Sequence, residues 1–345
     1  MSLQTLLGIE LPIIQAPLAG VQDSALAIAV SNAGGLGSLP CAMLDAAALR
    51  KQVELLRAGT SHPFNLNFFS HTPPVPDEDK ARAWRALFAD YYAELGLDPV
   101  AQPAGAARLP FDEEMAAVVC EARPAVVSFH FGLPAPALLE RVRATGARIL
   151  ASATTVDEAR WLEAQGVDAV IAQGLEAGGH RGMFLSEDIA TQVGTFALVP
   201  QVVRAVRVPV IAAGGIADAQ GVRAALDLGA AGVQVGTAYM LCPEATTSAL
   251  HRAALKSESA RVTALTNLFT GRPARGIVNR LLRELGPMNA LAPQFPLAGS
   301  VVAPLRAKAE SLGRDDFSPL WAGQNVSGCR EIGAGELTLA LARLV

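Results

Sequence analysis

Short apolar segments alternate with segments of helical pattern through roughly the first two thirds of the chain, and no other feature constrains the fold as strongly. Several are almost unbroken runs of small or branched apolar residues, which is typical of strands buried on both faces. The predicted strands are Pro12–Pro17, Gly35–Leu39, Pro63–Phe69, Ala125–Phe131, Arg148–Ala153, Ala169–Gln173, Val208–Ala213 and Ala231–Val235.

The segments between these strands carry helix start and stop signals. Helices are predicted over Ser24–Asn32, Pro136–Thr145, Val156–Gln165 and Asp218–Leu228, each followed within two residues by glycine. The regular alternation favours an α/β fold, a (β/α)8 TIM barrel, over the alternative of a doubly wound open sheet.

Two segments interrupt the alternation. We expect residues 1–240 to form the barrel, with an insertion at about 71–115 after the third strand. Residues 241–345 are predicted to form a largely helical extension that packs on the barrel and contributes to the substrate pocket.

Composition narrows the class of protein. The chain has 345 residues, 51% of them hydrophobic, so it can bury a large core. The net charge of −4 predicts no binding to nucleic acid or to a membrane surface. Four dispersed cysteines and the absence of a signal-peptide pattern indicate a cytoplasmic protein, which we expect to be a monomer or weak homodimer.

Polar and glycine-rich groups gather where the predicted strands end, which is where barrel enzymes place their active sites. They comprise Asn65 and Asn67, Ser128 and His130, Gln173 through Gly182, Gly214 and Gly215, and Gln234 through Thr237. Each has a structural reading of its own, since a buried Asn is often a satisfied amide and a histidine between two phenylalanines is often a core residue. Five strand ends carrying such groups together predict a binding site.

Glycine-containing loops after the last two strands indicate a phosphorylated ligand. Backbone N–H groups approach a phosphate closely where no Cβ intervenes, and the barrel phosphate site lies in these two loops. Gly214-Gly215 and Gly236-Thr237 match that site.

Several chemistries are disfavoured by what the strand ends lack. None of the four lysines lies at a strand end, which disfavours Schiff-base chemistry. No cluster of Asp, Glu and His is present there, so no metal site is predicted. Amides, two histidines and a phosphate site suit a cofactor with its own reactivity, such as a flavin.

A set of motifs in this order resembles the nitronate monooxygenases, formerly called 2-nitropropane dioxygenases. The matching segments are 15–17, 31–38, 63–67, 128–132, 172–182, 212–216, 234–238, 271–276 and 321–324. The resemblance implies an FMN-dependent barrel that oxidises alkyl nitronates, propionate 3-nitronate above all, or neutral nitroalkanes. The oxidant is O2, the products are a carbonyl compound and nitrite, and no NAD(P)H is consumed.

The resemblance also implies roles for individual residues. FMN is expected to bind at Asn67, Gln173, Gly178, Gly179, Gly214, Gly215, Gln234, Val235, Gly236 and Thr237, with Ala16, Pro17 and Leu18 along the flavin edge. His180 is expected to be the base that removes the α-proton of a neutral nitroalkane, and His130 a second histidine of the pocket.

One segment departs from the family pattern. Many members have tyrosines where this chain has Phe295 and Gly299, and a lysine where it has Ala303. We place Phe295 in the substrate pocket and expect a less polar pocket rim, which leaves the preferred nitronate open.

Other functions remain as alternatives. The first is an NAD(P)H-dependent flavin reductase of the quinone or enoyl-thioester type. A flavin-free barrel acting on a phosphorylated metabolite is the second, and a non-catalytic flavin-binding protein is the third.

Overall fold

The computed structural model describes residues 2–98 and 108–345 and contains an eight-stranded parallel barrel. Its strands are β1 Ile13–Gln15, β2 Gly37–Pro40, β3 Phe64–Phe69, β4 Val126–His130, β5 Arg148–Ala153, β6 Ala169–Gln173, β8 Val210–Ala213 and β9 Gly232–Val235. They follow the order β1-β9-β8-β6-β5-β4-β3-β2, and a parallel bridge between Ile14 and Leu36 links β1 to the start of β2. The predicted TIM barrel is therefore confirmed, and each predicted strand is present within two residues of its predicted bounds.

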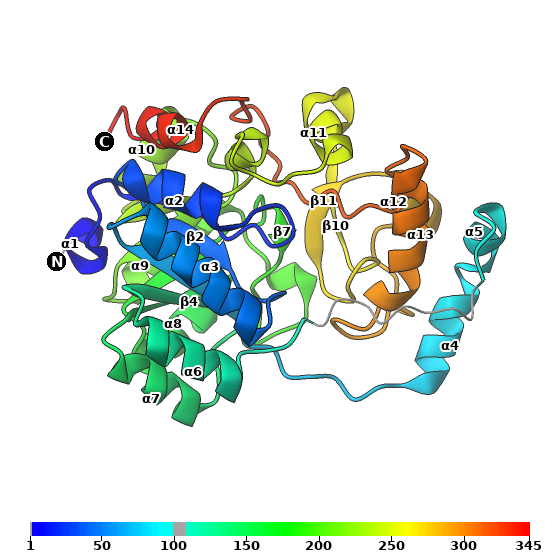
Figure 1. The fold of residues 1–345 in the computed structure, drawn as a ribbon, viewed down its shortest axis with the longest axis horizontal. Helices are drawn as coiled ribbons and strands as arrows, with labels where there is room; N and C mark the ends of the chain where they lie inside the picture. Colours follow the sequence, from blue (N-terminus) through cyan, green and yellow to red (C-terminus); the bar gives the residue numbers. More distant parts are fainter. Residues whose placement is uncertain (1, 99–107) are drawn as a thin grey trace.

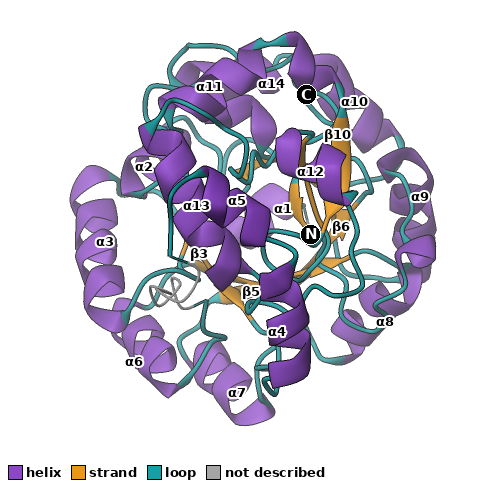
Figure 2. Cartoon of the chain, turned by 90° about the vertical axis from the view of Figure 1, so that its right-hand side faces the viewer, coloured by secondary structure: helices purple, strands orange, loops and turns teal. Residues whose placement is uncertain are grey.

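Helices surround the barrel in a ring (Figure 2). They are α2 Ser24–Asn32, α3 Ala46–Gly59, α6 Glu113–Ala122, α7 Pro136–Ala144, α8 Val156–Ala164, α9 Thr195–Ala205, α10 Ala219–Asp227 and the late helix α14 Ala334–Leu341. Side chains at the N-caps of α2, α3, α6, α8 and α10 accept hydrogen bonds from first-turn N–H groups, which would otherwise lack partners. The four helices predicted by sequence coincide with α2, α7, α8 and α10.

The N-terminal end of the barrel is filled with apolar side chains. Helix α1, Leu3–Leu7, buries Leu3 and Leu7 in the same cluster as Ile14, Ile171 and Ile211 from the barrel interior. In Figure 1, α1 lies at the side of the barrel opposite to α12 and α13. A ligand pocket in the barrel must therefore open at the C-terminal ends of the strands.

The extension that follows the barrel contains strands as well as helices. Strands β10 Thr263–Thr266 and β11 Ala274–Ile277 pair antiparallel, and β11 also pairs with the two-residue strand β7, Gly179–His180. Besides α14, which joins the ring around the barrel, the helices of the extension are α11 Ala249–Lys256, α12 Arg280–Leu285 and α13 Gly299–Ser311. Short 3-10 helices lie at Ile189–Thr191, Thr237–Leu241 and Glu258–Arg261. The small sheet, which the sequence did not predict, joins the extension to the loop after β6.

The insertion after β3 packs on this extension. It forms α4 Glu78–Ala86 and α5 Ala89–Glu94, which lie beside α12 and α13 (Figure 1). The indole N–H of Trp84 donates to the main-chain oxygen of Ala298 at 3.1 Å, and the Tyr92 hydroxyl donates to that of Val301 at 2.8 Å. We call residues 71–98, 108–112 and 243–325 together the cap.

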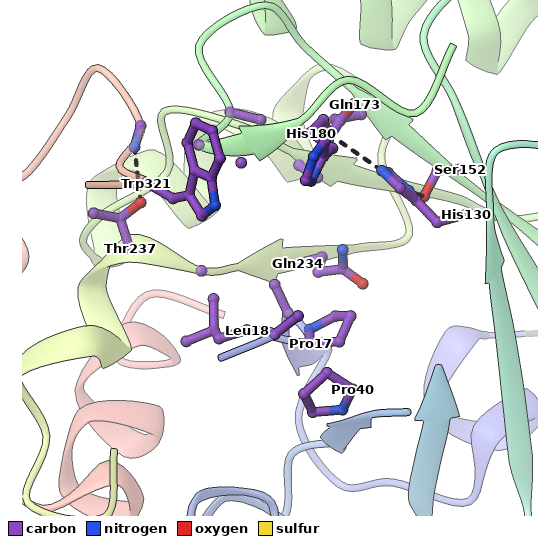
Figure 3. A pocket seen from close by; sticks show the side chains of 18 of the residues that line it. Pro17, Leu18, Pro40, His130, Ser152, Gln173, His180, Gln234, Thr237 and Trp321 are labelled. Atoms are coloured by element: carbon purple, nitrogen blue, oxygen red, sulfur yellow. Dashed lines mark hydrogen bonds between the residues drawn. The ribbon is translucent and has the colours of Figure 1, made fainter. Parts of the chain in front are cut away.

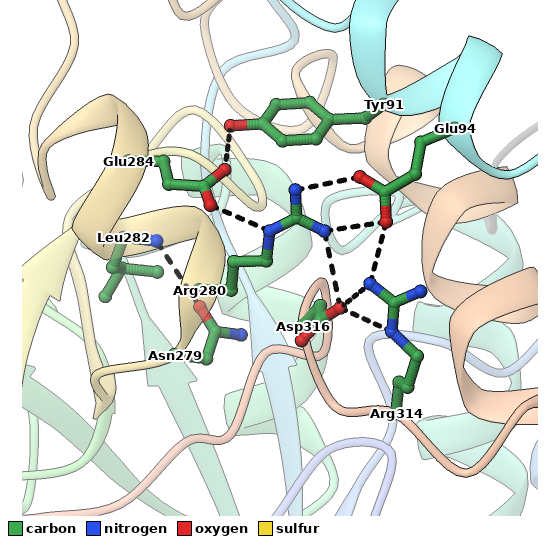
Figure 4. Close-up of polar contacts among 8 residues, drawn as sticks. All are labelled: Tyr91, Glu94, Asn279, Arg280, Leu282, Glu284, Arg314 and Asp316. Atoms are coloured by element: carbon green, nitrogen blue, oxygen red, sulfur yellow. Dashed lines mark hydrogen bonds and ion pairs between the residues drawn. The ribbon is translucent and has the colours of Figure 1, made fainter.

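Charged groups join the two parts of the cap (Figure 4). Arg280 on α12 binds Glu94 on α5 and Glu284 on its own helix, each at 2.8 Å. Arg314 binds the same Glu94 at 2.8 Å, and the Tyr91 hydroxyl donates to Glu284. The hydrogen bonds from Arg280, and then from Arg314, lower the pKa of Glu94 to about 2.

Candidate active site

A pocket lies at the C-terminal ends of the barrel strands, between the barrel and the cap (Figure 3). It brings together most of the site residues that the sequence predicted, although they come from distant segments. Those that line it are Ala16, Pro17, Leu18, Asn67, His130, Gln173, Gly178, Gly179, His180, Gly214, Gly215, Gln234, Gly236 and Thr237.

Two predicted residues do not line the pocket. Val235 is 1% exposed and packs in the core between sheet and helices, because side chains alternate along a strand and its neighbour Gln234 takes the pocket side. Phe295 is also buried, and its ring centroid lies 5.3 Å from that of His180 and 4.8 Å from that of His71. The structure therefore places Phe295 behind the histidines instead of at the rim.

Glycines form one end of the pocket, where backbone segments approach closely. A Cβ on Gly178 would lie 2.5 Å from the main-chain nitrogen of Gly323, and a Cβ on Gly214 would lie 3.0 Å from that of Ala177. Gly214 and Gly215 have φ values of +115° and +73°, which favour glycine. The predicted glycine loops thus form a narrow cradle of backbone, which has no room for a side chain at Gly178 or Gly214.

The C-terminal segment completes this cradle. The main-chain N–H of Gly323 donates to the Thr237 hydroxyl at 3.0 Å, and the Asn325 amide donates to the main-chain oxygen of Gly215 at 3.1 Å. Gly323 and Asn325 line the pocket but were not among the predicted site residues. Their segment carries a family-like motif, and that motif is the signal that would have found them.

The amide side chains of the pocket differ in how many of their hydrogen-bonding atoms have a partner in the protein. Asn67 donates to the Ser128 hydroxyl at 2.9 Å. Gln173 donates to the main-chain oxygen of His180 at 3.0 Å and accepts from the Gly182 N–H at 2.8 Å. The Oε1 atom of Gln234 is buried and has no hydrogen-bond partner among the described residues, which costs about 1–3 kcal/mol for a polar group. Gln234 therefore has a buried acceptor left for a ligand N–H group.

His180 stands on β7, where the barrel loop meets the sheet of the cap. The Thr270 hydroxyl lies 2.9 Å from Nε2 of His180 and donates to the main-chain oxygen of Arg272 at 3.4 Å. We therefore assign the ring proton to Nε2, so that Nδ1 is an acceptor. No described residue donates to Nδ1. Burial, and after it the positive charge of Arg108, holds the pKa of His180 well below its usual range, so the ring is neutral.

His130 has no ring nitrogen available. Its Nε2 donates to the main-chain oxygen of His180 at 3.2 Å, and its Nδ1 accepts from the Ser152 hydroxyl at 3.0 Å (Figure 3). Burial lowers the pKa of His130 to about 3. His130 therefore holds the His180 main chain in place, whereas His180 keeps an unshared acceptor atom.

Further residues complete the pocket walls, and none of them was among the predicted site residues, although Trp321 lies in the family-like segment 321–324. They include Pro40, Met43, Phe69, Arg108, Ser152, Ile171, Met240 and Trp321. The indole ring of Trp321 lies 5.5 Å from the His180 ring. Arg108 and Trp321 belong to the cap. The cap sequence has no regular apolar pattern, so the orientation of these two side chains cannot be predicted from it.

The pocket geometry is consistent with the comparison of this chain with known protein families. A family model described as nitronate monooxygenase matches residues 1–343. The chain belongs to the nitronate monooxygenase family. The resemblance seen in the sequence is thereby confirmed, and the chain is a flavin-dependent oxidoreductase of this family.

Individual relatives cover almost the whole chain. A nitronate monooxygenase of Pseudomonas aeruginosa is 44% identical over 339 residues, which are 97% of this chain and 96% of the relative. A nitroalkane oxidase structure from Streptomyces ansochromogenes has a TM-score of 0.90 at 39% identity and covers 99% of this chain and 97% of its own. FabK from Thermotoga maritima is more distant, with a TM-score of 0.75 at 29% identity over 99% and 94% of the two chains.

Among residues 2–98 and 108–345, no helix is long and apolar enough to cross a membrane. The same residues contain no group of three or more His, Cys, Asp and Glu side chains that could hold a metal ion.

Proposed function

We propose that the chain uses FMN to oxidise alkyl nitronates with O2 to a carbonyl compound and nitrite. The observation that carries this proposal is a neutral histidine, His180, whose free nitrogen lies in a pocket with a glycine cradle and an unpartnered amide oxygen. The family match and the relatives named for this activity support it.

The residues present fit a flavin mononucleotide. The isoalloxazine ring has one N–H group, which suits the orphaned Oε1 of Gln234. The cradle of Gly214, Gly215 and Gly236 suits a single phosphate, and the chain lacks the strand–GxGxxG–helix unit expected for a dinucleotide. Bound FMN supplies the electron acceptor for nitronate oxidation and the reaction with O2.

The protein residues supply binding and proton transfer. A neutral nitroalkane must lose its α-proton before oxidation, and Nδ1 of His180 is the atom that accepts it. The Thr270 hydroxyl holds the other ring nitrogen, and His130 holds the main chain of the same residue. A nitronate is already the anion and needs no base.

The charge of the pocket favours an anionic substrate. Its described lining contains one cationic side chain, Arg108, and no carboxylate. A nitronate entering this positive and largely apolar pocket gains favourable electrostatic interaction, because burial weakens the screening by water.

The experiment is a spectrum followed by anaerobic mixing. We expect a yellow protein that releases FMN on denaturation and is reduced by alkyl nitronates without oxygen. FAD in place of FMN contradicts the cofactor proposal. Rapid reduction by NADH together with no reaction with nitronates contradicts the proposed activity and supports the reductase alternative.

A further inference from the structure

Arg108 brings a positive charge into the pocket from the cap side. It lines the pocket, and its Nη1 atom lies 4.0 Å from the position that a Cβ on Gly299 would occupy. Its charge is one of the causes that lower the pKa of His180. The guanidinium therefore lies at the histidine end of the pocket, beside the start of α13.

Within the part of the chain that the structure describes, no anionic group compensates the charge of this guanidinium. Among residues 2–98 and 108–345, no hydrogen bond or ion pair holds the Arg108 side chain, and it is only partly exposed. Burial and the like charge of Arg306 lower the pKa of Arg108. A desolvated cation without an anion costs stability, so its retention at a pocket wall indicates an anionic ligand group.

The phosphate of the cofactor does not account for this charge. The glycine cradle that suits a phosphate is formed by the loops after β8 and β9 and by residues 323–325. Arg108 instead neighbours Gly299 and acts on His180, where the substrate is placed by the proposed function.

Gly299 leaves the space next to the guanidinium open. A Cβ at this position would lie 2.9 Å from the main-chain oxygen of Phe269, so the backbone accepts no side chain here. The tyrosine that many family members have at this position is incompatible with this arrangement. The sequence predicts a less polar pocket rim. In the structure the Arg108 guanidinium, which comes from a different segment, places a positive charge there.

We propose that Arg108 determines substrate specificity by binding a carboxylate on the alkyl chain of the nitronate, through the paired N–H groups of its guanidinium. The preferred substrates are nitronates with a second negative charge a few carbons from the nitronate carbon. This inference rests on the proposed function, because it assigns a substrate group to the same pocket.

The test compares propionate 3-nitronate with the uncharged-chain butyl 1-nitronate. Arg108→Gln should lower the ratio of the two kcat/KM values about 10- to 100-fold, the range of a charge-assisted hydrogen-bond pair. Arg108→Lys, which keeps the charge but loses the fork, should lower it less. Arg306→Gln is the matched control, since it removes a nearby positive charge from a side chain that pairs with Glu310 and does not line the pocket.

A binding measurement gives an independent readout. Succinate resembles propionate 3-nitronate in shape and charge but is inert, and its binding is followed through the flavin spectrum with butyrate as the singly charged reference. The Arg108→Gln variant should weaken succinate 10- to 100-fold more than butyrate.

The outcomes separate this inference from the proposed function. If the wild type oxidises neither nitronate, the proposed function fails. If it oxidises both and Arg108→Gln changes both equally, or if Arg306→Gln has the same effect on the ratio, Arg108 does not recognise a carboxylate and the inference is overturned.

Discussion

The barrel face and the cap face of the pocket are built in different ways. The barrel face consists of strand ends whose residues, such as Asn67, Gln173 and Gln234, follow regular strands. The cap face comes from irregular segments and contributes Arg108 and Trp321 to the lining. The barrel face has the features of a cofactor site, and the cap face has the charge and the rings that select a substrate.

The two faces meet at one residue. His180 belongs to the loop after β6, yet its strand pairs with β11 of the cap, and its ring nitrogen contacts Thr270. Substitutions that act on the barrel face, on the cap face or at this junction should therefore have separable effects.

The largest effect is expected at the junction. His180→Asn should lower turnover of a neutral nitroalkane such as nitroethane by roughly 10²–10⁴-fold, the usual value of a positioned base. Turnover of the preformed nitronate should fall much less, because it needs no proton removal. Steady-state kinetics on both substrates, with the FMN content measured, checks this; equal losses with FMN fully bound would show that His180 is not the base.

The next effect tests the barrel face alone. Gly214→Val should weaken FMN binding about 100-fold, since the new side chain collides with the Thr195 side chain and the Ala177 backbone in an unfavourable φ region. Gly286→Val is the control, because Gly286 also has a positive φ but no atom lies within 4 Å of its Cβ position. Flavin titration measures both, and similar losses in the two variants would refute a specific cradle.

Acidification should destabilise the protein through the buried histidines of the cap. Burial lowers the pKa of His71 and of His251, both in the cap, to about 4. The unfolded chain binds these protons below about pH 6.5, so stability is complete above that pH and is lost as pH falls toward 4.

One variant tests the contribution of a single histidine to this pH dependence. Between about pH 6.5 and pH 4, each of the two histidines changes the free energy of unfolding by up to about 1.4 kcal/mol per pH unit. His251→Gln, which retains a donor for the main-chain oxygen of Trp321, should reduce the difference in unfolding free energy between pH 7.5 and pH 5.5 by about that amount. Denaturant titrations at the two pH values measure it, and an unchanged difference would mean that His251 is not kept neutral by the fold.

The smallest effect concerns the charged network of the cap. Arg280→Gln should cost about 0.5–1 kcal/mol of stability, because Arg280 bridges α5 and α12 with partly exposed partners. Arg223→Gln breaks an exposed pair within α10 and should leave stability unchanged. Thermal unfolding compares the two, and an equal response would show that the network adds nothing beyond an ordinary surface pair.

The sequence by itself determined the elements that repeat. The period of apolar residues predicted the eight strands, and glycine and N-cap signals placed helices such as α2 and α10, because these patterns act over a few neighbouring residues. Polar residues at the strand ends predicted most of the barrel face, since parallel strands in a barrel bring their C-terminal ends together.

The positions of the remaining residues relative to the pocket depend on the tertiary structure. Val235 was expected in the site and lies in the core, because a one-residue step in a strand reverses the side chain. Phe295 packs behind His180, and Arg108 takes a place at the wall, through contacts between segments more than 100 residues apart. Such contacts depend on how α13 and the small sheet pack on the barrel, and no local pattern encodes that packing.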